Sequence, residues 1–308
     1  MRNRIDIIIK SWNAVKYTEM AVASIRQKTK IPYRITVVDN ASSAQNLFRL
    51  RLIKGINLIE HEKNLGPAWA AITGYEKTHS KYFVLMDNDV VVSNGWLNKL
   101  LEYMEKDNEL GIVSPLRYSD LWKYPGSDKS SRTVWEEIRD KSGLNPKEAL
   151  EEYLGAYTIE QFAGQLVREN KLKNEYLVSP PGFVSSSCLL LNRDILEIVG
   201  GVARIFFEEY GGEDVDMCWR VGNAGYKILR SKRVYIHHFG HSSVRENSLD
   251  INELLKRSNI KLHKIWNERV MKKQHELLRD NSLVSLEKKY PFISLFNKIN
   301  RGLDGKIF

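Results

Sequence analysis

Cysteine is scarce in this chain, which has only Cys188 and Cys218 among its 308 residues. The two positions form no metal-ligand spacing and suggest no disulfide framework. Long apolar runs are also missing, since none approaches the ~20 residues that a membrane-spanning helix needs. The N-terminus carries charge from Arg2 onwards and shows no signal-peptide pattern. These absences together predict a protein of a reducing, cytoplasmic compartment.

Acidic residues are outnumbered, and most of the excess positive charge lies near the C-terminus. The net charge is +9, and residues 251–308 hold 13 Lys and Arg against 6 Asp and Glu, which is +7 of that total. This excess is typical of a solvated helical surface, but it also fits contact with an anionic membrane, a nucleic acid or an acidic acceptor. Basic and apolar residues alternate near Tyr290, Phe292, Leu295 and Phe296, which indicates either an interfacial amphipathic helix or core packing.

The first 116 residues alternate between strand and helix patterns. Apolar runs predict strands over 5–9, 34–39, 56–60, 82–87 and 112–115, and helical spacing predicts helices over 17–27, 68–77 and 95–104. An apolar fraction of 43% is enough for a buried core. The alternation predicts an α/β fold of Rossmann-like type, with a mostly parallel sheet and helices on both of its faces.

Residues 118–180 differ from the segments around them. They are polar and rich in Glu, Lys and Tyr, with helical patterns over 133–141 and 146–172 and a good helix start at Asn145. We interpret them as an inserted helical subdomain, which is either a lid or acceptor platform or a surface feature of no specific role. The chain then returns to the core with a strand over 183–191, a helix that ends at Gly225, and a strand pair at 227–230 and 234–243.

Two carboxylates follow the most apolar of these strands. Residues 82–89 read YFVLMDND, so Asp87 and Asp89 emerge at the carboxyl end of a buried strand, where open α/β sheets bind their ligands. Carboxylate oxygens suit a hard divalent cation, and a cation with only two protein ligands keeps positions for phosphate oxygens. An isolated Asp-x-Asp is more often a solvated turn, but other segments of this chain agree with the metal interpretation.

Two later segments add side chains that suit a catalytic site. Glu213 and Asp214 fall in the first turn of a helix, where they either cap free amides or supply a general base. Three histidines follow within five residues, at His237, His238 and His241. One histidine added to the aspartate pair would favour Mn²⁺ or a similar ion over Ca²⁺. We expect at least one of the three to make only a local hydrogen bond.

In combination, these motifs resemble glycosyltransferase family 2, the large GT-A family that uses nucleotide-sugars. The segments that carry the resemblance are Asp87-Asn-Asp89, Glu213-Asp214-Val-Asp216, His237-His238-Phe-Gly-His241-Ser, Val37-Val38-Asp39-Asn40-Ala-Ser42 and the rhamnosyltransferase-like turn Lys63-Asn64-Leu-Gly66-Pro-Ala. The resemblance covers residues 4–116 and 182–243. It implies a GT-A catalytic domain over 1–245, made of a nucleotide-binding half (1–116), the helical insert (118–180) and an acceptor and catalytic half (182–245). A basic helical extension over 246–308 follows.

The resemblance implies that one group of residues binds the nucleotide. Its members are Ser11, Asn13, Asn64 and Gly66, with Asp39 on the base, usually uracil or thymine. Two positions depart from the family pattern: Trp12 replaces a more usual Tyr or Phe, which still permits stacking on the base, and Gln45 stands where an Asp often occurs.

A second group is implied for the metal and the chemistry. Asp87 would contact the ribose or the metal, and Asp89 would ligate Mn²⁺ or Mg²⁺. His238, or else His237, would be the third protein ligand or a contact of the diphosphate. Asp214 would be the catalytic base, and Glu213 would position it.

The implied function is that of a metal-dependent, inverting glycosyltransferase of the hexosyltransferase type. It would move a sugar from a UDP- or dTDP-sugar to a hydroxyl of a glycan, a lipid-linked acceptor or a protein, and its basic extension would allow peripheral contact with an anionic membrane. A sugar nucleotidyltransferase is one alternative, but the turn Lys10-Ser-Trp-Asn13 lacks the glycine-rich phosphate loop that such an enzyme needs. A non-enzymatic nucleic-acid-binding protein is another, but a basic charge confined to the tail disfavours a nucleic-acid partner.

Overall fold

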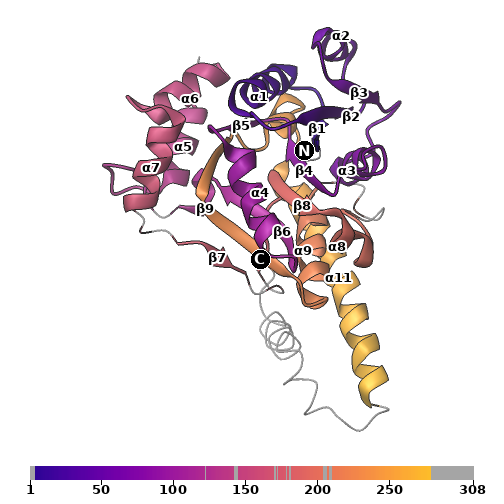
Figure 1. Cartoon of the computed structure of the whole chain (residues 1–308). Coiled ribbons are helices and arrows are strands. Elements are labelled where there is room, and N and C mark those ends of the chain that lie inside the picture. The colour runs from indigo at the N-terminus through magenta and orange to yellow at the C-terminus, as the bar shows by residue number, and fades with distance from the viewer. Residues whose placement is uncertain are drawn as a thin grey trace.

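The chain folds around one large sheet with helices on both of its faces (Figure 1). The computed structural model describes residues 4–278 except 122, 142–144, 170, 172, 178, 180, 181, 204–206, 208 and 209, with side chains described as far as 268. The strands are β1 (Ile5–Ser11), β2 (Tyr33–Asp39), β3 (Asn57–Glu60), β4 (Tyr82–Asp87), β5 (Val90–Val92), β6 (Leu110–Leu116), β7 (Glu175–Tyr176), β8 (Cys188–Asn192) and β9 (Lys227–His238). The helices are α1 (Val15–Lys28), α2 (Ala44–Leu52), α3 (Pro67–Glu76), α4 (Trp96–Lys106), α5 (Ser131–Arg139), α6 (Pro146–Leu154), α7 (Ile159–Glu169), α8 (Arg193–Ile198), α9 (Glu213–Asn223), α10 (Ser242–Glu246) and α11 (Ile251–Leu278), with a 3-10 turn over Tyr118–Asp120.

The sheet has the strand order β3-β2-β1-β4-β8-β6-β9-β5, with β7 paired to β9. Strands β3, β2, β1 and β4 are parallel, as the sequence predicts, in a register that places Lys10 beside Asp87. The other half is mixed, since β8 runs antiparallel to β4 and β6, β9 is parallel to β6, and β5 and β7 are antiparallel to β9. The predicted parallel order is therefore correct for β1 to β4, and it is wrong where β8 enters the sheet after the insert and runs in the opposite direction.

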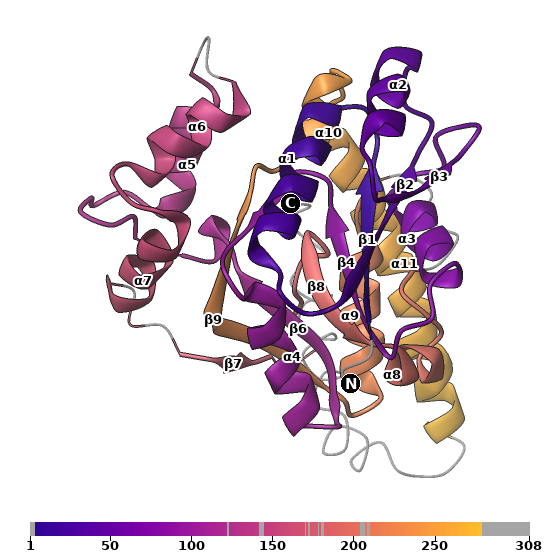
Figure 2. The same ribbon diagram turned by 45° about the horizontal axis from the view of Figure 1, so that its top comes forward.

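Strand side chains alternate between two apolar layers, one on each face of the sheet. Ile7 and Ile9 belong to a layer that contains buried residues of α1 and α4, such as Trp96. Ile8 belongs to the opposite layer, with residues of α3, α8, α9 and the first half of α11. Figure 2 shows α1 and α4 on one side of the sheet and α3 and α11 on the other. Because both faces are covered, β1 is buried along its whole length.

Helices α5, α6 and α7 form an apolar cluster of their own beside β9. Trp135, Tyr153 and Phe162 fill this cluster, which also includes residues at the end of β9. Asn145 caps α6 in a capping box, so the predicted helix start is correct. The single helix predicted over 146–172 is wrong, because Gly155, with a φ of 61°, ends α6 and a second helix follows.

Four other segments differ from the prediction. Helix α2 occupies residues that carry little apolar pattern, and Leu50 is its one buried residue. Strand β5 is three residues long and directly follows the Asp-Asn-Asp motif. Strand β8 begins at Cys188, five residues later than predicted. The predicted strand pair at 227–230 and 234–243 is one continuous strand, β9, which ends at His238.

The C-terminal extension starts as α11, whose first half packs on the rest of the chain. Leu262 and Trp266 are buried in the layer that contains α9, and Nε1 of Trp266 donates to Asp216 Oδ1 at 3.1 Å. The hydroxyl of Ser258 donates to the backbone carbonyl of Tyr210. None of the helices in the described part of the chain combines the length and the apolar character that crossing a bilayer requires. The predicted amphipathic segment around Tyr290, Phe292, Leu295 and Phe296 lies outside the described residues.

Candidate active site

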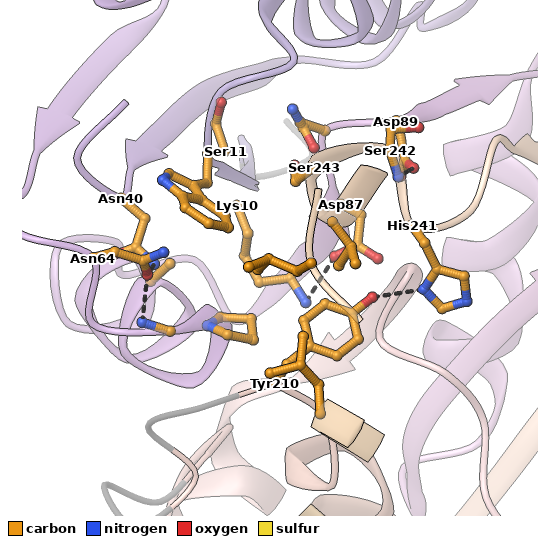
Figure 3. A pocket seen from close by; sticks show the side chains of 18 of the residues that line it. Lys10, Ser11, Asn40, Asn64, Asp87, Asp89, Tyr210, His241, Ser242 and Ser243 are labelled. Carbon is orange, nitrogen blue, oxygen red and sulfur yellow. Dashed lines mark hydrogen bonds and ion pairs between the residues drawn. The ribbon is translucent and has the colours of Figure 1, made fainter. Parts of the chain in front are cut away.

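A cavity of about 330 Å³ opens at the carboxyl ends of β1 and β4. Open α/β sheets bind their ligands at this edge. Trp12, helix α3 and the segment after β9 contribute apolar walls. Figure 3 labels ten of the polar residues in the lining, which are Lys10, Ser11, Asn40, Asn64, Asp87, Asp89, Tyr210, His241, Ser242 and Ser243, and the lining also includes Asn88 and His238.

Asp87, Asp89 and His238 form a compact group of possible metal ligands in this cavity. One oxygen of each aspartate and one ring nitrogen of the histidine lie within 4.8 Å of one another. Nε2 of His238 is 3.1 Å from Asp89 Oδ1 and 3.6 Å from Asp87 Oδ2. The aspartates come from the end of β4 and the turn after it, and the antiparallel pairing of β5 with β9 places His238 opposite Val90. The structure thus brings together the three residues that the sequence analysis assigned to a metal.

Asp89 is held firmly within this group. Burial by itself would raise the pKa of its carboxyl group, but His238 and the hydroxyl and N–H of Ser242 lower that pKa below its usual value. The N–H of Ser242 donates to Asp89 Oδ2 at 3.2 Å, and the backbone carbonyl of Asp89 accepts from the N–H of Phe239 at 2.9 Å. Asp89 is therefore ionised at neutral pH, which is the form that binds a cation.

The two neighbouring histidines have other surroundings. His237 is fully buried among the rings of Trp135, Tyr153 and Phe239, and burial lowers its pKa to about 3. This is the environment of a neutral histidine in an apolar cluster, so the geometry places His238, and not His237, with the aspartates. His241 lines the cavity with its Nδ1 at 2.8 Å from the hydroxyl of Tyr210.

Lys10 is a buried cation that the sequence analysis did not assign to the site. Its Nζ is 2.9 Å from Asp87 Oδ1 and 3.0 Å from Ser186 Oγ. Lys10 and Asp87 are neighbours in the parallel register of β1 and β4, so their side chains point to the same face of the sheet and meet. Burial by itself would lower the pKa of the ammonium, but Asp87, Glu213 and Asp214 raise it above its usual value. Lys10 therefore carries its charge at neutral pH.

Glu213 and Asp214 begin helix α9. Glu213 is buried, and burial together with the charge of Asp214 raises its pKa to about 7. Asp214 is partly exposed and accepts hydrogen bonds from the N–H of Ser186 at 3.2 Å and the N–H of Val215 at 2.8 Å. Burial raises the pKa of Asp214 as well. The two carboxyl groups adjoin the cavity lining through Ser186 and Lys10, and their pKa values are moved towards the range that suits a general base.

The residues assigned to the nucleotide lie along the opposite wall, some in the lining and some behind it. Ser11, Asn64 and Gly66 line the cavity. Asp39 is buried behind them, where its carboxylate accepts hydrogen bonds from the hydroxyl and the N–H of Ser42. Burial raises the pKa of Asp39, and these two hydrogen bonds only partly offset that rise.

Two asparagines, Asn13 and Asn40, connect the loops of this wall by hydrogen bonds. Asn13 has a φ of 50°, accepts from the N–H of Ser43 at 2.8 Å and donates to Asn247 Oδ1 at 2.6 Å. Asn40 donates to Asn64 Oδ1 at 2.6 Å. The turn that resembles the family's asparagine-glycine turn is thus fixed to the end of β2.

Several lining residues were missed by the sequence analysis. Tyr210 belongs to none of the motifs, and Leu249 and Leu254 reach the cavity from the start of the C-terminal extension. Lys10 could have been recognised from the sequence, because a charged residue in a buried apolar strand needs a partner. Asp87, at the end of another buried strand, was the natural candidate.

Comparison with known proteins agrees with this geometry. Residues 6–197, more than half of the chain, match the family model described as Glycosyl transferase family 2. The chain belongs to glycosyltransferase family 2. The resemblance inferred from the five short motifs is therefore confirmed.

Family-2 relatives resemble the chain over different lengths. An uncharacterized glycosyltransferase of Haemophilus influenzae is 28% identical over 141 residues, which are 39% of this chain and 44% of that protein. The N-acetylglucosaminyl-diphospho-decaprenol L-rhamnosyltransferase of Mycobacterium tuberculosis is 24% identical over 260 residues and covers 80% of each chain. Several of the curated relatives are more than twice as long as the part of them that this chain spans.

Solved structures show the same fold. GalNAc-T7, solved with UDP, GalNAc and Mn²⁺, has a TM-score of 0.53 at 17% identity, over 76% of this chain and 43% of that one. A mannosyltransferase from Pyrobaculum calidifontis, in complex with GDP-Man and Mn²⁺, has a TM-score of 0.51 at 17% identity, over 77% and 57%. These likenesses confirm the predicted GT-A type of α/β fold for this family-2 chain.

Proposed function

We propose that this family-2 protein is a glycosyltransferase that moves a sugar from a UDP- or dTDP-sugar to the hydroxyl group of an acceptor. The observation that carries the proposal is the group formed by Asp87, Asp89 and His238 within one cavity at the carboxyl ends of β1 and β4. The leaving group of such a transfer is a nucleoside diphosphate, which needs positive charge around it. Trp12 lines the same cavity and offers an aromatic face to a base.

The donor atoms of this group fit Mn²⁺ or Mg²⁺. Two carboxylate oxygens and one imidazole nitrogen within 4.8 Å of one another can converge on one ion, and the nitrogen favours Mn²⁺ over Ca²⁺. An ion held by Asp87, Asp89 and His238 would supply Lewis-acid stabilisation of the diphosphate charge. The presence of Mn²⁺ in the two solved structures of the same fold supports this assignment.

Asp214 is the proposed base. The acceptor oxygen attacks the anomeric carbon, and the bond from that carbon to the phosphate oxygen breaks with its electron pair on the oxygen. The proton of the acceptor hydroxyl passes to Asp214, whose raised pKa increases its affinity for that proton. Glu213 precedes it in the first turn of α9 and is proposed to position it. One base and a direct attack predict inversion at the anomeric carbon.

We assign acceptor binding to segments of the chain outside the cavity. The insert packs beside β9, and we assign it to the binding of a glycan, lipid-linked or protein acceptor. The mycobacterial rhamnosyltransferase that covers 80% of this chain is named for N-acetylglucosaminyl-diphospho-decaprenol, which supports a lipid-linked acceptor. Lys256, Arg257 and Lys264 are exposed on α11 and would attract an anionic membrane surface. The division into a catalytic domain over 1–245 and an extension over 246–308 stays a prediction.

Hydrolysis of UDP- and dTDP-sugars tests the proposal, because slow donor hydrolysis needs no acceptor. We expect release of the nucleoside diphosphate that requires Mn²⁺ or Mg²⁺ and stops with EDTA, and thermal stabilisation by the same diphosphate with Mn²⁺. Stabilisation by DNA without any effect of nucleotides would overturn the proposal. Product NMR that shows a retained anomeric configuration would refute inversion.

The base is tested by the variant Asp214→Asn. It should bind the nucleoside diphosphate like the wild type and lose turnover. Asp194→Asn is a matched control, since Asp194 occupies the first turn of α8 as Asp214 occupies that of α9. Unchanged turnover in Asp214→Asn would remove this residue from the catalytic role.

A further inference from the structure

Lys10 connects the two acidic parts of the site through one chain of contacts. Its Nζ is bonded to Asp87 Oδ1 at 2.9 Å and to Ser186 Oγ at 3.0 Å, and the N–H of Ser186 donates to Asp214 Oδ2 at 3.2 Å. Figure 3 shows the ammonium meeting Asp87 in the middle of the cavity, between the wall with Asn64 and the side chain of Tyr210. A buried positive charge therefore stands between the proposed metal ligands and the proposed base.

This ammonium has binding capacity that its protein partners do not use. A lysine ammonium has three N–H donors, and Asp87 and Ser186 accept two of them. Over the residues that the structure describes, no third acceptor is bonded to Nζ, although Lys10 is only 7% exposed. Lys10 nevertheless lines the cavity. A diphosphate that reaches Asp87 in the cavity comes within reach of the remaining donor.

The negative charges around the cavity are a second reason to expect a cation at this position. Asp87, Asp89, Glu213 and Asp214 place four carboxyl groups in and beside the lining, and they would repel a diphosphate. Lys10 contacts Asp87 directly and is linked to Asp214 through Ser186. A fixed charge in a buried site interacts more strongly with an anion than an exposed one, because the surroundings screen it less.

We propose that Lys10 is a catalytic residue that donates a hydrogen bond to the sugar-bearing phosphate of the donor. The inference rests on the proposed function. When the bond between the anomeric carbon and the phosphate oxygen breaks, the electron pair stays on that oxygen and the acceptor proton goes to Asp214. Lys10 keeps its own proton and stabilises the charge that the phosphate gains. A compact ammonium suits this contact, since it acts as a point charge in a narrow space.

Binding of diphosphates and monophosphates to Lys10→Met tests the proposal. In calorimetry with Mn²⁺, the affinity for UDP or dTDP should fall about 10- to 100-fold, as for the loss of one charge-assisted hydrogen bond. The affinity for UMP or dTMP, which lack the second phosphate, should change little. In donor hydrolysis, kcat should fall by a larger factor than KM rises, and Lys10→Arg should recover part of both because it keeps the charge.

The matched control replaces another lysine, which contacts two carboxylates. Lys227 contacts Asp107 at 3.0 Å and Glu109 at 2.7 Å, away from the cavity, and Lys227→Met should leave both affinities and kcat unchanged. If circular dichroism shows that Lys10→Met does not fold, Lys10→Gln is tested in its place, because it keeps polar atoms near Asp87 without the charge.

Three results would overturn the inference in distinguishable ways. An equal loss of affinity for diphosphate and monophosphate would show that Lys10 only maintains the shape of the site. Unchanged affinity and kcat would remove Lys10 from the reaction. Failure of the wild-type protein to bind UDP or dTDP would refute the proposed function itself, and the inference with it.

Discussion

Replacing Glu213 by glutamine should make the protein more stable at alkaline pH and change little in acid. Glu213 is 5% exposed at the start of α9, and burial with the neighbouring charge of Asp214 raises its pKa from 4.5 to about 7. Between these two pH values the folded protein holds a proton that the unfolded chain has released. The stability contributed by protonated Glu213 is therefore lost as the pH rises through this range.

The size of this loss follows from the two pKa values. A rise from 4.5 to about 7, at about 1.4 kcal/mol for each pH unit, costs the wild type about 3 kcal/mol of unfolding free energy between pH 4 and pH 8. The amide of Glu213→Gln does not ionise, so the variant escapes this cost. The difference in unfolding free energy, variant minus wild type, should therefore rise by about 3 kcal/mol across the same range.

Urea denaturation at closely spaced pH values measures this difference. Ionisable groups far from Glu213 titrate alike in both proteins, so their contributions cancel in the comparison. Glu137→Gln is the comparison variant, because it makes the same replacement at a carboxyl group that is exposed on α5. If the difference in unfolding free energy between Glu213→Gln and the wild type did not change with pH, the argument that burial destabilises the charged form of Glu213 would be refuted.

Three further tests address the metal ligands, the C-terminal helix and the packing of α3. Asp89→Asn removes a charged ligand and should weaken Mn²⁺ binding at least about tenfold in calorimetry; unchanged affinity would contradict the metal assignment. Trp266→Phe removes the donor to Asp216 and should lower the unfolding free energy by about 1–3 kcal/mol in urea; an unaltered value would show that the bond contributes nothing. Gly74→Ala would place a Cβ 2.2 Å from a side chain of β1 and should lower the unfolding free energy by about 1–3 kcal/mol. Gly164→Ala in α7 has room for the Cβ and should raise the unfolding free energy by up to about 1 kcal/mol. Equal melting temperatures for the two variants would refute this packing argument.

The parallel part of the sheet, β1 to β4, could be predicted because the information for it lies within each segment. Each buried strand is a mostly apolar run, and parallel order follows from the alternation with helices. Asp87 and Asp89 were recognised because both follow directly on such a run. His238 was identified as a candidate from its motif, but only the pairing of β5 with β9 separates it from His237.

The rest of the site depends on contacts between distant segments. The bond between Lys10 and Asp87 requires the register of β1 and β4, which no single segment encodes. Leu249 and Leu254 enter the cavity because α11 packs on the core, and their own sequence carries no sign of a ligand. The antiparallel direction of β8 was missed for the same reason, since it is decided by the path of the insert before it.

Helix α11 begins in the wall of the cavity and continues into the apolar layer around Trp266. A molecule that fills the cavity therefore binds the docked form of this helix and not a frayed one. By mass action, occupancy shifts the local opening equilibrium of α11 towards the closed state. Its amide protons should then exchange more slowly with deuterium as the ligand concentration rises. Part of the free energy of binding any ligand in the cavity would thus stabilise backbone that does not contact that ligand.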